Sequence, residues 1–148
     1  MITFMRELAE NVIEEIKPLL ELHWREIAHY QDIELDPDWE FYKNAKTVRV
    51  YTCRDEGKLI GYGVFFVGLN HKYLQCLQAM QDILFVLPEH RGKLTGFRLI
   101  KYCDEQLKAE GVKAVYQHVK HGTNLGDLLR LVGYEIAESV YTRRLDKG

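Results

Sequence analysis

The stretch LPEHRGKLTG, residues Leu87 to Gly96, decides the fold because it joins an apolar run to an amphipathic helical pattern. The run before it, Ala79–Leu87, contains ILFVL and is typical of a strand buried on both faces. After the loop, apolar residues at steps of three and four predict a helix: Phe97, Ile100, Cys103 and Leu107. A basic, glycine-containing loop between strand and helix either makes an ordinary turn or directs backbone N–H groups at an anion.

The sequence before the loop predicts helices followed by a hairpin. Residues 13–27 carry an apolar helical stripe interrupted by Pro18, where we expect a kink or a break. Asp36–Pro37, a capping residue followed by proline, predicts the start of a second helix. In residues 47–68, the alternating segment TVRVYTCR, the turn DEGK and the segment LIGYGVFFVG predict two antiparallel strands.

The sequence after the loop completes a parallel unit. Residues 113–119 (KAVYQHV) predict a strand, residues 124–131 a short helix closed by Gly133, and residues 134–145 one or two final strands. N-terminal helices, an antiparallel hairpin and then strand, helix and strand predict an α/β fold with a mixed sheet and one central βαβ unit. No linker or repeat divides the chain, so we expect a single domain over residues 1–148.

Composition narrows the classes of function. A net charge of −2 over 148 residues gives no general reason to expect nucleic acid as a partner. Cys53, Cys76 and Cys103 are odd in number and widely spaced, as free thiols in a reducing compartment would be. The N-terminus does not resemble a signal peptide, the apolar runs are too short to span a bilayer, and the histidines lack metal-binding spacing. We therefore expect a cytoplasmic protein without a membrane partner or a metal.

The loop has the features of a phosphate cradle. A helix N-terminus presents unpaired N–H groups and the positive end of the helix dipole. Gly92 and Gly96 allow a ligand to approach the backbone closely, while Arg91 and Lys93 add positive charge. The alternatives are a polar turn, a solvated basic face or a nucleic-acid contact, although so compact a basic cluster fits a small phosphate ligand better. The Walker and GxGxxG fingerprints are absent.

The same span resembles the acetyl-CoA-binding motif of the GNAT superfamily of N-acetyltransferases, V-x-P-x-x-R-G-x-G-x-G. The residues in register with that motif are Val86, Pro88, Arg91, Gly92, Lys93 and Gly96. Leu94 departs from it, because the family normally has glycine there. The segment TNLGDLLRLVGYE is similar to the family's second cofactor motif and closes on Gly133–Tyr134. The resemblance covers nearly the whole chain and implies a GNAT-like fold.

The resemblance also implies acetyl-CoA as co-substrate and assigns the residues that hold it. The pyrophosphate is expected on the loop that comprises Arg91, Gly92, Lys93, Leu94, Thr95 and Gly96. Backbone amides of the preceding strand are expected to contact the pantetheine arm and to polarise the thioester carbonyl, at Phe85, Val86 and Leu87. Asn124 is expected to contact the cofactor arm, to cap the short helix over residues 124–131, or to do both.

The catalytic residues are less clearly marked. Asp82 stands where the family often places a base, and a carboxylate entering an apolar strand should have a raised pKa; equally, it could be structural. The family's usual helix tyrosine is missing, because residues 128–131 are Leu, Leu, Arg and Leu. Tyr116, Tyr141 and His118 are the substitutes for the leaving-group acid, unless water or no acid serves.

The segment DIELDPDWE, residues 32–40, suggests the kind of acceptor. It carries carboxylates at alternate positions, and in the family's layout this region commonly overhangs the acceptor side of the cleft. We expect Asp32, Glu34 and Asp38 to attract a cationic amine. An ordinary surface loop, with Asp36 capping the next helix, would explain part of the pattern without a substrate.

Two other functions remain open at this stage. Leu94 and the missing helix tyrosine are compatible with a degenerate member that binds CoA without turnover. The same fold could also serve as a non-enzymatic module that recognises a partner. The expected partners of an active enzyme are acetyl-CoA and an amine acceptor, and a homodimer is possible.

Overall fold

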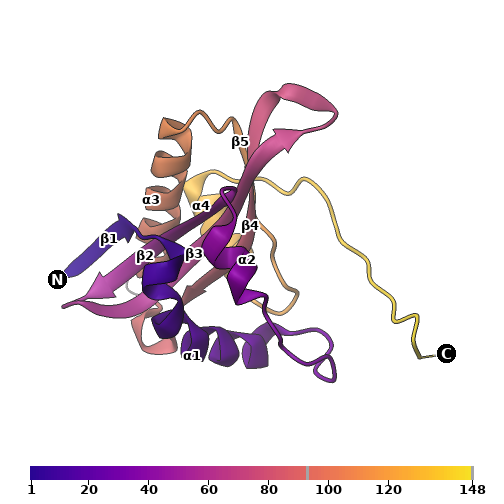
Figure 1. Ribbon diagram of the computed structural model, residues 1–148, viewed down its shortest axis with the longest axis horizontal. Coiled ribbons are helices and arrows are strands. Elements are labelled where there is room, and N and C mark those ends of the chain that lie inside the picture. Colours follow the sequence, from indigo (N-terminus) through magenta and orange to yellow (C-terminus); the bar gives the residue numbers. More distant parts are fainter. Residues whose placement is uncertain (93, 148) are drawn as a thin grey trace.

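The structure is a computed structural model that describes residues 1–92 and 94–147. Within these residues, five strands form one mixed sheet in the order β1-β2-β3-β4-β5 (Figure 1). Neighbours from β1 to β4 are antiparallel, whereas β5 runs parallel to β4. The strands are β1 (Ile2–Arg6), β2 (Val48–Asp55), β3 (Lys58–Asn70), β4 (Tyr73–Val86) and β5 (Ala114–Tyr116).

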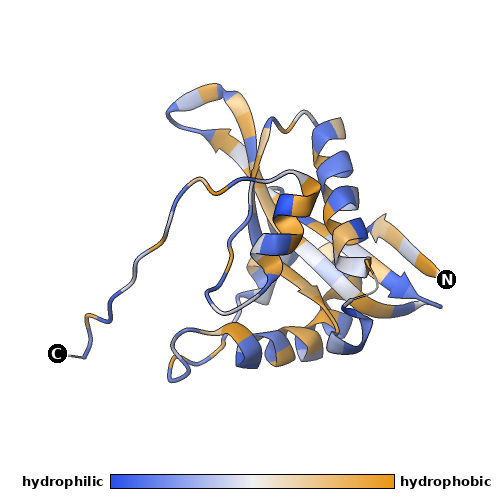
Figure 2. Cartoon of the chain, turned by 180° about the vertical axis from the view of Figure 1, so that it is seen from behind, coloured by the Kyte–Doolittle hydropathy of each residue, from blue (hydrophilic) through white to orange (hydrophobic). Residues whose placement is uncertain are grey.

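Helices cover both faces of the sheet. They are α1 (Ala9–Ile27), α2 (Trp39–Asn44), α3 (Thr95–Ala109) and α4 (Leu125–Val132), with a short 3-10 turn η1 (Pro88–His90). Successive residues of a strand point to opposite faces of the sheet, so two neighbouring β3 residues identify the helices on each face. Val64 faces α1 and α2, while the position of a Cβ on Gly63 would lie 3.4 Å from Cys103 Sγ of α3. Figure 2 shows hydrophobic residues on the sheet-facing sides of the helices.

The core follows from the predicted periodicity. The buried side chains of α1 recur at helical spacing: Val12, Ile13, Ile16 and Leu20. The α3 helix buries Leu99, Ile100, Cys103 and Leu107 in the same way. Each such burial contributes roughly 1.5–3 kcal/mol relative to an exposed side chain. Gly111 follows α3 with φ +94°, the left-handed conformation expected just beyond a helix end.

The mixed α/β fold and its central βαβ unit are confirmed, with several local differences. The α1 helix is continuous through Pro18, so a break was the wrong expectation, although its axis changes direction along its length (Figure 1). The second helix starts later than predicted, because Asp38 rather than Asp36 is the N-cap: its Oδ1 accepts a 3.0 Å hydrogen bond from Phe41 N. None of the described helices is both long and apolar enough to cross a membrane.

The strands differ most from the sequence predictions. The short strand β1 was missed, and β4 begins at Tyr73 because a second hairpin pairs it with β3 along most of their length. The strand predicted over residues 113–119 is reduced to β5. The final strands predicted over residues 134–145 do not form, since no partner lies beside this segment within the described chain. It extends away from the body as a tail (Figure 1).

Candidate active site

An irregularity in β4 opens the sheet beside the candidate site. Val64 pairs with Ile83 and Phe65 with Gln81, so Asp82 is an extra residue that bulges from the ladder. On its other side, β4 pairs with β5 only from Gln78 to Met80. In the described chain, the part of β4 from Asp82 onward therefore has a strand neighbour only in β3. Its other edge presents backbone groups that a ligand can use.

The ladder identifies which amides face that edge. Leu87 N donates to Ile60 O of β3 at 2.8 Å. Phe85, two residues before Leu87 on β4, pairs with Tyr62 of β3. In an antiparallel pair, the backbone N–H and C=O groups of successive residues point alternately toward and away from the neighbouring strand. The amides of Phe85 and Leu87 therefore point toward β3, and the amide of Val86 points away from it. The Val86 carbonyl also points away from β3, since it accepts a 2.8 Å hydrogen bond from Arg91 Nε. Of the three residues expected to contact the cofactor, Val86 is the one with an available amide.

The loop between β4 and α3 has the backbone expected of a phosphate cradle. Gly92 (φ +85°) and Leu94 (φ +62°) are both left-handed, so Leu94 adopts a conformation that glycine adopts readily. The first helical hydrogen bond described runs from Arg98 N to Leu94 O, which leaves the amides of Thr95 and Gly96 at the open helix N-terminus. Lys93, predicted to add charge here, lies outside the described residues.

Gly96 and Arg91 have structural partners that the sequence did not reveal. A Cβ at Gly96 would lie 3.0 Å from Leu128 Cδ2, so this glycine lets α3 pack closely against α4. The guanidinium of Arg91 binds Glu26 of α1 through two contacts of 3.0 and 3.1 Å and lies 5.4 Å from the Phe85 ring. Arg91 therefore fastens the loop to α1 and β4 instead of pointing freely at an anion.

Asn124 precedes α4 without capping it through its side chain. Its carbonyl accepts a hydrogen bond from Asp127 N at 3.2 Å, and its exposed side chain makes no cap hydrogen bond. Asn124 lies four residues before Leu128, the α4 residue that packs beside Gly96. This placement puts α4 next to the cradle, with the Asn124 amide available to a ligand.

Asp82 lies at the bulge and receives a hydrogen bond from α2. Tyr42 Oη donates to Asp82 Oδ2 at 2.7 Å, a contact between residues forty apart that spacing alone did not predict. Burial raises the pKa of Asp82, although the hydrogen bond from Tyr42 and the nearby His118 lower it in part. Asp82 is an exposed residue by surface area, yet the surrounding atoms still desolvate its carboxylate. The result is a reachable carboxylate with a raised pKa.

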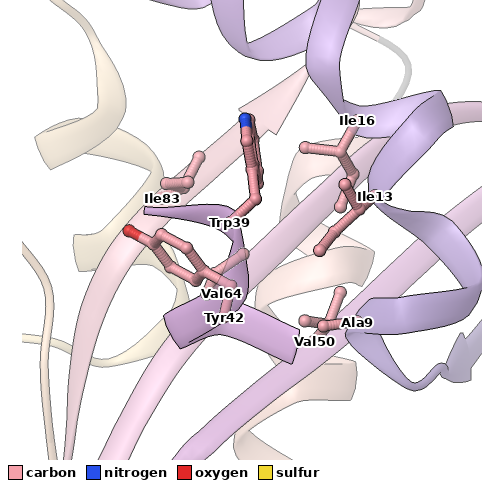
Figure 3. A pocket seen from close by; sticks show the side chains of 8 residues that line it. All are labelled: Ala9, Ile13, Ile16, Trp39, Tyr42, Val50, Val64 and Ile83. Carbon is pink, nitrogen blue, oxygen red and sulfur yellow. The ribbon is translucent and has the colours of Figure 1, made fainter. Parts of the chain in front are cut away.

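Two tyrosines accompany Asp82. Burial, together with the Asp82 hydrogen bond, raises the pKa of Tyr42 above its usual range, so the phenol remains a donor. Tyr62 is buried, and its hydroxyl has no hydrogen-bond partner among residues 1–92 and 94–147. Burial, followed by the charges of Asp82 and Tyr42, raises the pKa of Tyr62. Tyr42 and Trp39 line an apolar cavity of about 10 Å³. In Figure 3 the Tyr42 hydroxyl points away from α1. That cavity holds at most one water, so it is a packing defect.

The candidate acids are placed differently. Tyr116 of β5 is half-buried opposite Met80, and its Oη accepts from Gln78 Nε2 at 3.5 Å. The backbone N–H of His118 donates to Gln81 Oε1 at 2.7 Å, next to Asp82. Tyr141 is 93% exposed on the tail and is not brought to the site, because the strand that would have carried it there does not form. Within the described chain, the structure thus gives no contact that would bring Tyr141 to Asp82.

Of the three candidate acceptor residues, Asp32 and Glu34 line the same surface cavity, whereas Asp38 does not. Asp32 is paired with Arg144 Nη1 at 2.8 Å and with Lys147, while Asp38 serves as the α2 N-cap. Glu34 lines a surface cavity of about 640 Å³ between α1 and the loop that follows it, together with Trp24 and Trp39. The ring of Trp39 lies 5.9 Å from that of Tyr42, which connects this cavity to the Asp82 region.

Comparisons with known proteins agree with this geometry. The model of the "Acetyltransferase (GNAT) family" matches residues 13–128. A search of curated proteins finds no match. A solved ribosomal-protein-alanine N-acetyltransferase from Brucella melitensis biovar Abortus 2308 superposes with a TM-score of 0.75 at 16% identity, covering 98% of this chain and 99% of that one.

Two further structures show the same fold. AAC(6′)-Iy, in complex with the bisubstrate analogue CoA-S-monomethyl-acetylneamine, gives a TM-score of 0.74 at 18% identity over 97% of each chain. An acetyltransferase from Clostridium acetobutylicum with acetyl-CoA gives 0.77 at 10% identity, over 100% of this chain and 99% of that one. The family match spans most of the chain, and β4, the loop after it and α3 follow one another in the order that the sequence motif predicted. The chain belongs to the acetyltransferase (GNAT) family, whose members are acetyl-CoA-dependent N-acetyltransferases.

Proposed function

We propose that this enzyme transfers the acetyl group of acetyl-CoA to a cationic primary amine. The observation that carries the proposal is the juxtaposition on β4 of an available Val86 amide and the Asp82 carboxylate, directly before the open N-terminus of α3. The Val86 amide can polarise the thioester carbonyl by donating a hydrogen bond to it, and the Asp82 carboxylate can accept the proton that the amine must lose.

The cofactor would be held mainly by backbone. Amides of Gly92, Leu94, Thr95 and Gly96 would bind the pyrophosphate at the positive end of the α3 dipole. Lys93 would add a charge there, while Arg91 would act through the shape of the loop. Val86 would donate to the thioester carbonyl, and Asn124 would contact the arm. Since these groups supply amides where the ligand carries oxygens, the site fits acetyl-CoA.

The proton moves through Asp82 in this proposal. Asp82, directly or through one water, takes the proton of the amine as the amine nitrogen attacks the thioester carbon. The C–S bond then breaks, and the departing thiolate takes a proton from water or from Tyr116. Tyr42 keeps the Asp82 carboxylate oriented by donating to Oδ2.

The acceptor would enter past Glu34. Its carboxylate, with Trp24 and Trp39 in the same cavity, can hold an ammonium group by charge and by contact with aromatic faces. Asp32 contributes less, because Arg144 and Lys147 already neutralise it. The neighbour AAC(6′)-Iy carries an acetylneamine-containing analogue, which makes aminoglycosides the first amines to test here.

The test combines binding and turnover. Isothermal titration with CoA should show saturable binding, and thiol release from acetyl-CoA should follow addition of polyamines, aminoglycosides or lysine peptides. Binding with no thiol release from any amine would support a degenerate CoA-binding member instead. Absence of CoA binding would favour a partner-recognition module.

A further inference from the structure

The α2 helix covers only part of its face of the sheet. It is 6 residues long, and Figure 1 shows the β3–β4 hairpin extending beyond it. Phe66 of β3 lies beside α2, with its ring 6.0 Å from that of Phe41 and 6.2 Å from that of Tyr42. Gly68 is two residues further along β3 and points to the same face. A Cβ at Gly68 would meet no atom of the described chain within 4 Å beyond its sequence neighbours, so the sheet is open here.

Apolar side chains line this open face. Met80 of β4 pairs with Phe66, and Tyr116 of β5 pairs with Met80. Directly paired residues of neighbouring strands point to the same face of a sheet, so these side chains lie on the face that α2 occupies. Met80 is 38% exposed, and Phe41 of α2 is 46% exposed. We call Phe41, Phe66, Met80 and Tyr116 the apolar floor, and contiguous apolar patches of this kind mark binding surfaces.

The apolar floor borders the candidate base. Asp82 follows Met80 by two residues on β4, and its carboxylate accepts the hydrogen bond from Tyr42 of α2, which places it on the same face. At the far end of the floor, Gln78 Nε2 lies 3.5 Å from Tyr116 Oη. The surface therefore offers a carboxylate at one end and an apolar area directly beside it. That combination is complementary to an amine that carries an apolar group.

We propose that the apolar floor binds the body of the acceptor, which is a primary amine with an aromatic ring on a short chain. The inference rests on the proposed function, in which Asp82 takes the proton of the amine, and it adds the chemical class of the group that the nitrogen carries. The charges of Asp82 and Glu34 attract every cationic amine alike, whereas the floor favours those with apolar area. A sugar amine would turn hydroxyls toward the floor and lose their hydrogen bonds to water.

Methyl NMR of the methionines tests this binding. The chain has three methionines, and Met1 and Met5 lie at β1, the opposite end of the sheet order from β5. Met5 is 46% exposed and is the matched internal control for Met80. Phenethylamine is titrated in the presence of CoA, beside ethylamine, which has the same ammonium group without the ring. We expect phenethylamine to shift the Met80 methyl signal alone, with a dissociation constant at least about 10-fold below that of ethylamine.

Removing one ring of the apolar floor should weaken the binding. Phe41→Ala keeps the backbone N–H that donates to Asp38, and alanine favours a helix, so α2 should still form. This variant is expected to raise the dissociation constant for phenethylamine by about 5-fold or more. Leu131→Ala is the control, because it removes a side chain that is 73% exposed on α4, and it should bind phenethylamine as the wild type does.

Binding and turnover are measured separately so that the two proposals can fail separately. Equal affinities of the wild type for phenethylamine and ethylamine would overturn the apolar floor as the acceptor site, even if both amines were acetylated. So would a Met80 signal that does not move, or one that moves no more than that of Met5. The expected Met80 shift without thiol release from acetyl-CoA would support the floor as a binding site and count against the proposed function.

Discussion

Leu94 shows how a single residue can depart from a motif while keeping its backbone shape. It stands at the position where the GNAT motif has glycine, yet its φ of +62° is the left-handed conformation that glycine adopts without a Cβ clash. Its side chain is 66% exposed, so little packing offsets the strain. The amides of the following turn remain placed for an anion, and the departure therefore does not by itself imply loss of CoA binding.

Replacing this residue should stabilise the protein. Leu94→Gly is expected to raise the free energy of unfolding by about 1 kcal/mol, because it removes the left-handed strain of a residue with a Cβ. Urea denaturation measures the change. Lys108→Gly, in the right-handed helix α3, is the matched control and should lower stability by about 1 kcal/mol. Equal destabilisation by both variants would show that Leu94 is not strained.

The Tyr42–Asp82 contact makes a prediction about pH. The hydrogen bond lowers the Asp82 pKa against the larger effect of burial, so Tyr42→Phe should raise that pKa further. A base acts when deprotonated, and the acidic limb of the kcat/KM profile should therefore move to higher pH. Tyr134→Phe is the control, because it removes another tyrosine–aspartate hydrogen bond, the 2.6 Å bond from Tyr134 to Asp104, which does not involve Asp82. If the acidic limb of the kcat/KM profile stays at the same pH in Tyr42→Phe, then Asp82 is not the group whose titration sets that limb.

At the scale of elements, a half-buried histidine packs α1 against β4. The His23 ring lies 4.9 Å from that of Phe85. Burial lowers the pKa of His23 to about 4, with Glu26 opposing and Arg91 and Lys120 reinforcing the shift. The neutral ring packs well against Phe85, whereas a charged ring would have to be solvated.

Acidification should consequently weaken the fold. Between pH of about 6.5 and about 4 the unfolded chain binds a proton that the folded chain does not, so stability falls as pH falls, by up to roughly 3 kcal/mol. His23→Gln should flatten this part of the curve of unfolding free energy against pH. His71→Gln, in the turn between β3 and β4, serves as the control. A variant curve parallel to that of the wild type would contradict the assignment.

The loop after α1 should select the charge of the acceptor. Glu34→Gln is expected to raise KM for cationic amines by about 3- to 10-fold with kcat little changed, since it removes one exposed charge from the rim of the cavity. Asp36→Asn removes a charge from the same acidic segment without lining that cavity and should act like the wild type. Equal effects of both variants would reduce the loop to a general negative surface.

The elements that could be read from the sequence are those with local signals. The sequence of residues Leu87 to Gly96 predicted the strand-to-helix turn, and the helical spacing of apolar residues predicted the buried faces of α1 and α3. The second hairpin was missed because β4 upstream of Ala79 is half polar, and the tail was assigned as strand because propensity does not show whether a partner exists. The Arg91–Glu26 pair joins residues 65 apart, which no spacing rule reports.

At the scale of the whole molecule, tertiary packing assembles the site from separate elements. Asp82 comes from a bulge in β4, its hydrogen-bond donor Tyr42 from α2, and the proposed anion site from the start of α3. The motif in the sequence led to the proposed cofactor loop because all parts of that loop are contiguous in the chain. The acid and the acceptor residues could not be located in that way, because their surroundings depend on distant parts of the chain. Tyr141 lies exposed on the tail. Asp32 forms an ion pair with Arg144, and Asp38 is the N-cap of α2.

The turnover of Asp82→Asn, measured beside its CoA affinity, tests the central claim most directly. The substitution keeps the size of the side chain and an oxygen for Tyr42, but the amide cannot accept the proton of the amine. We predict that kcat for the best amine falls by about 100-fold or more, while the dissociation constant for CoA stays within about twofold of the wild type. Wild-type turnover in this variant would contradict the claim that Asp82 is the base.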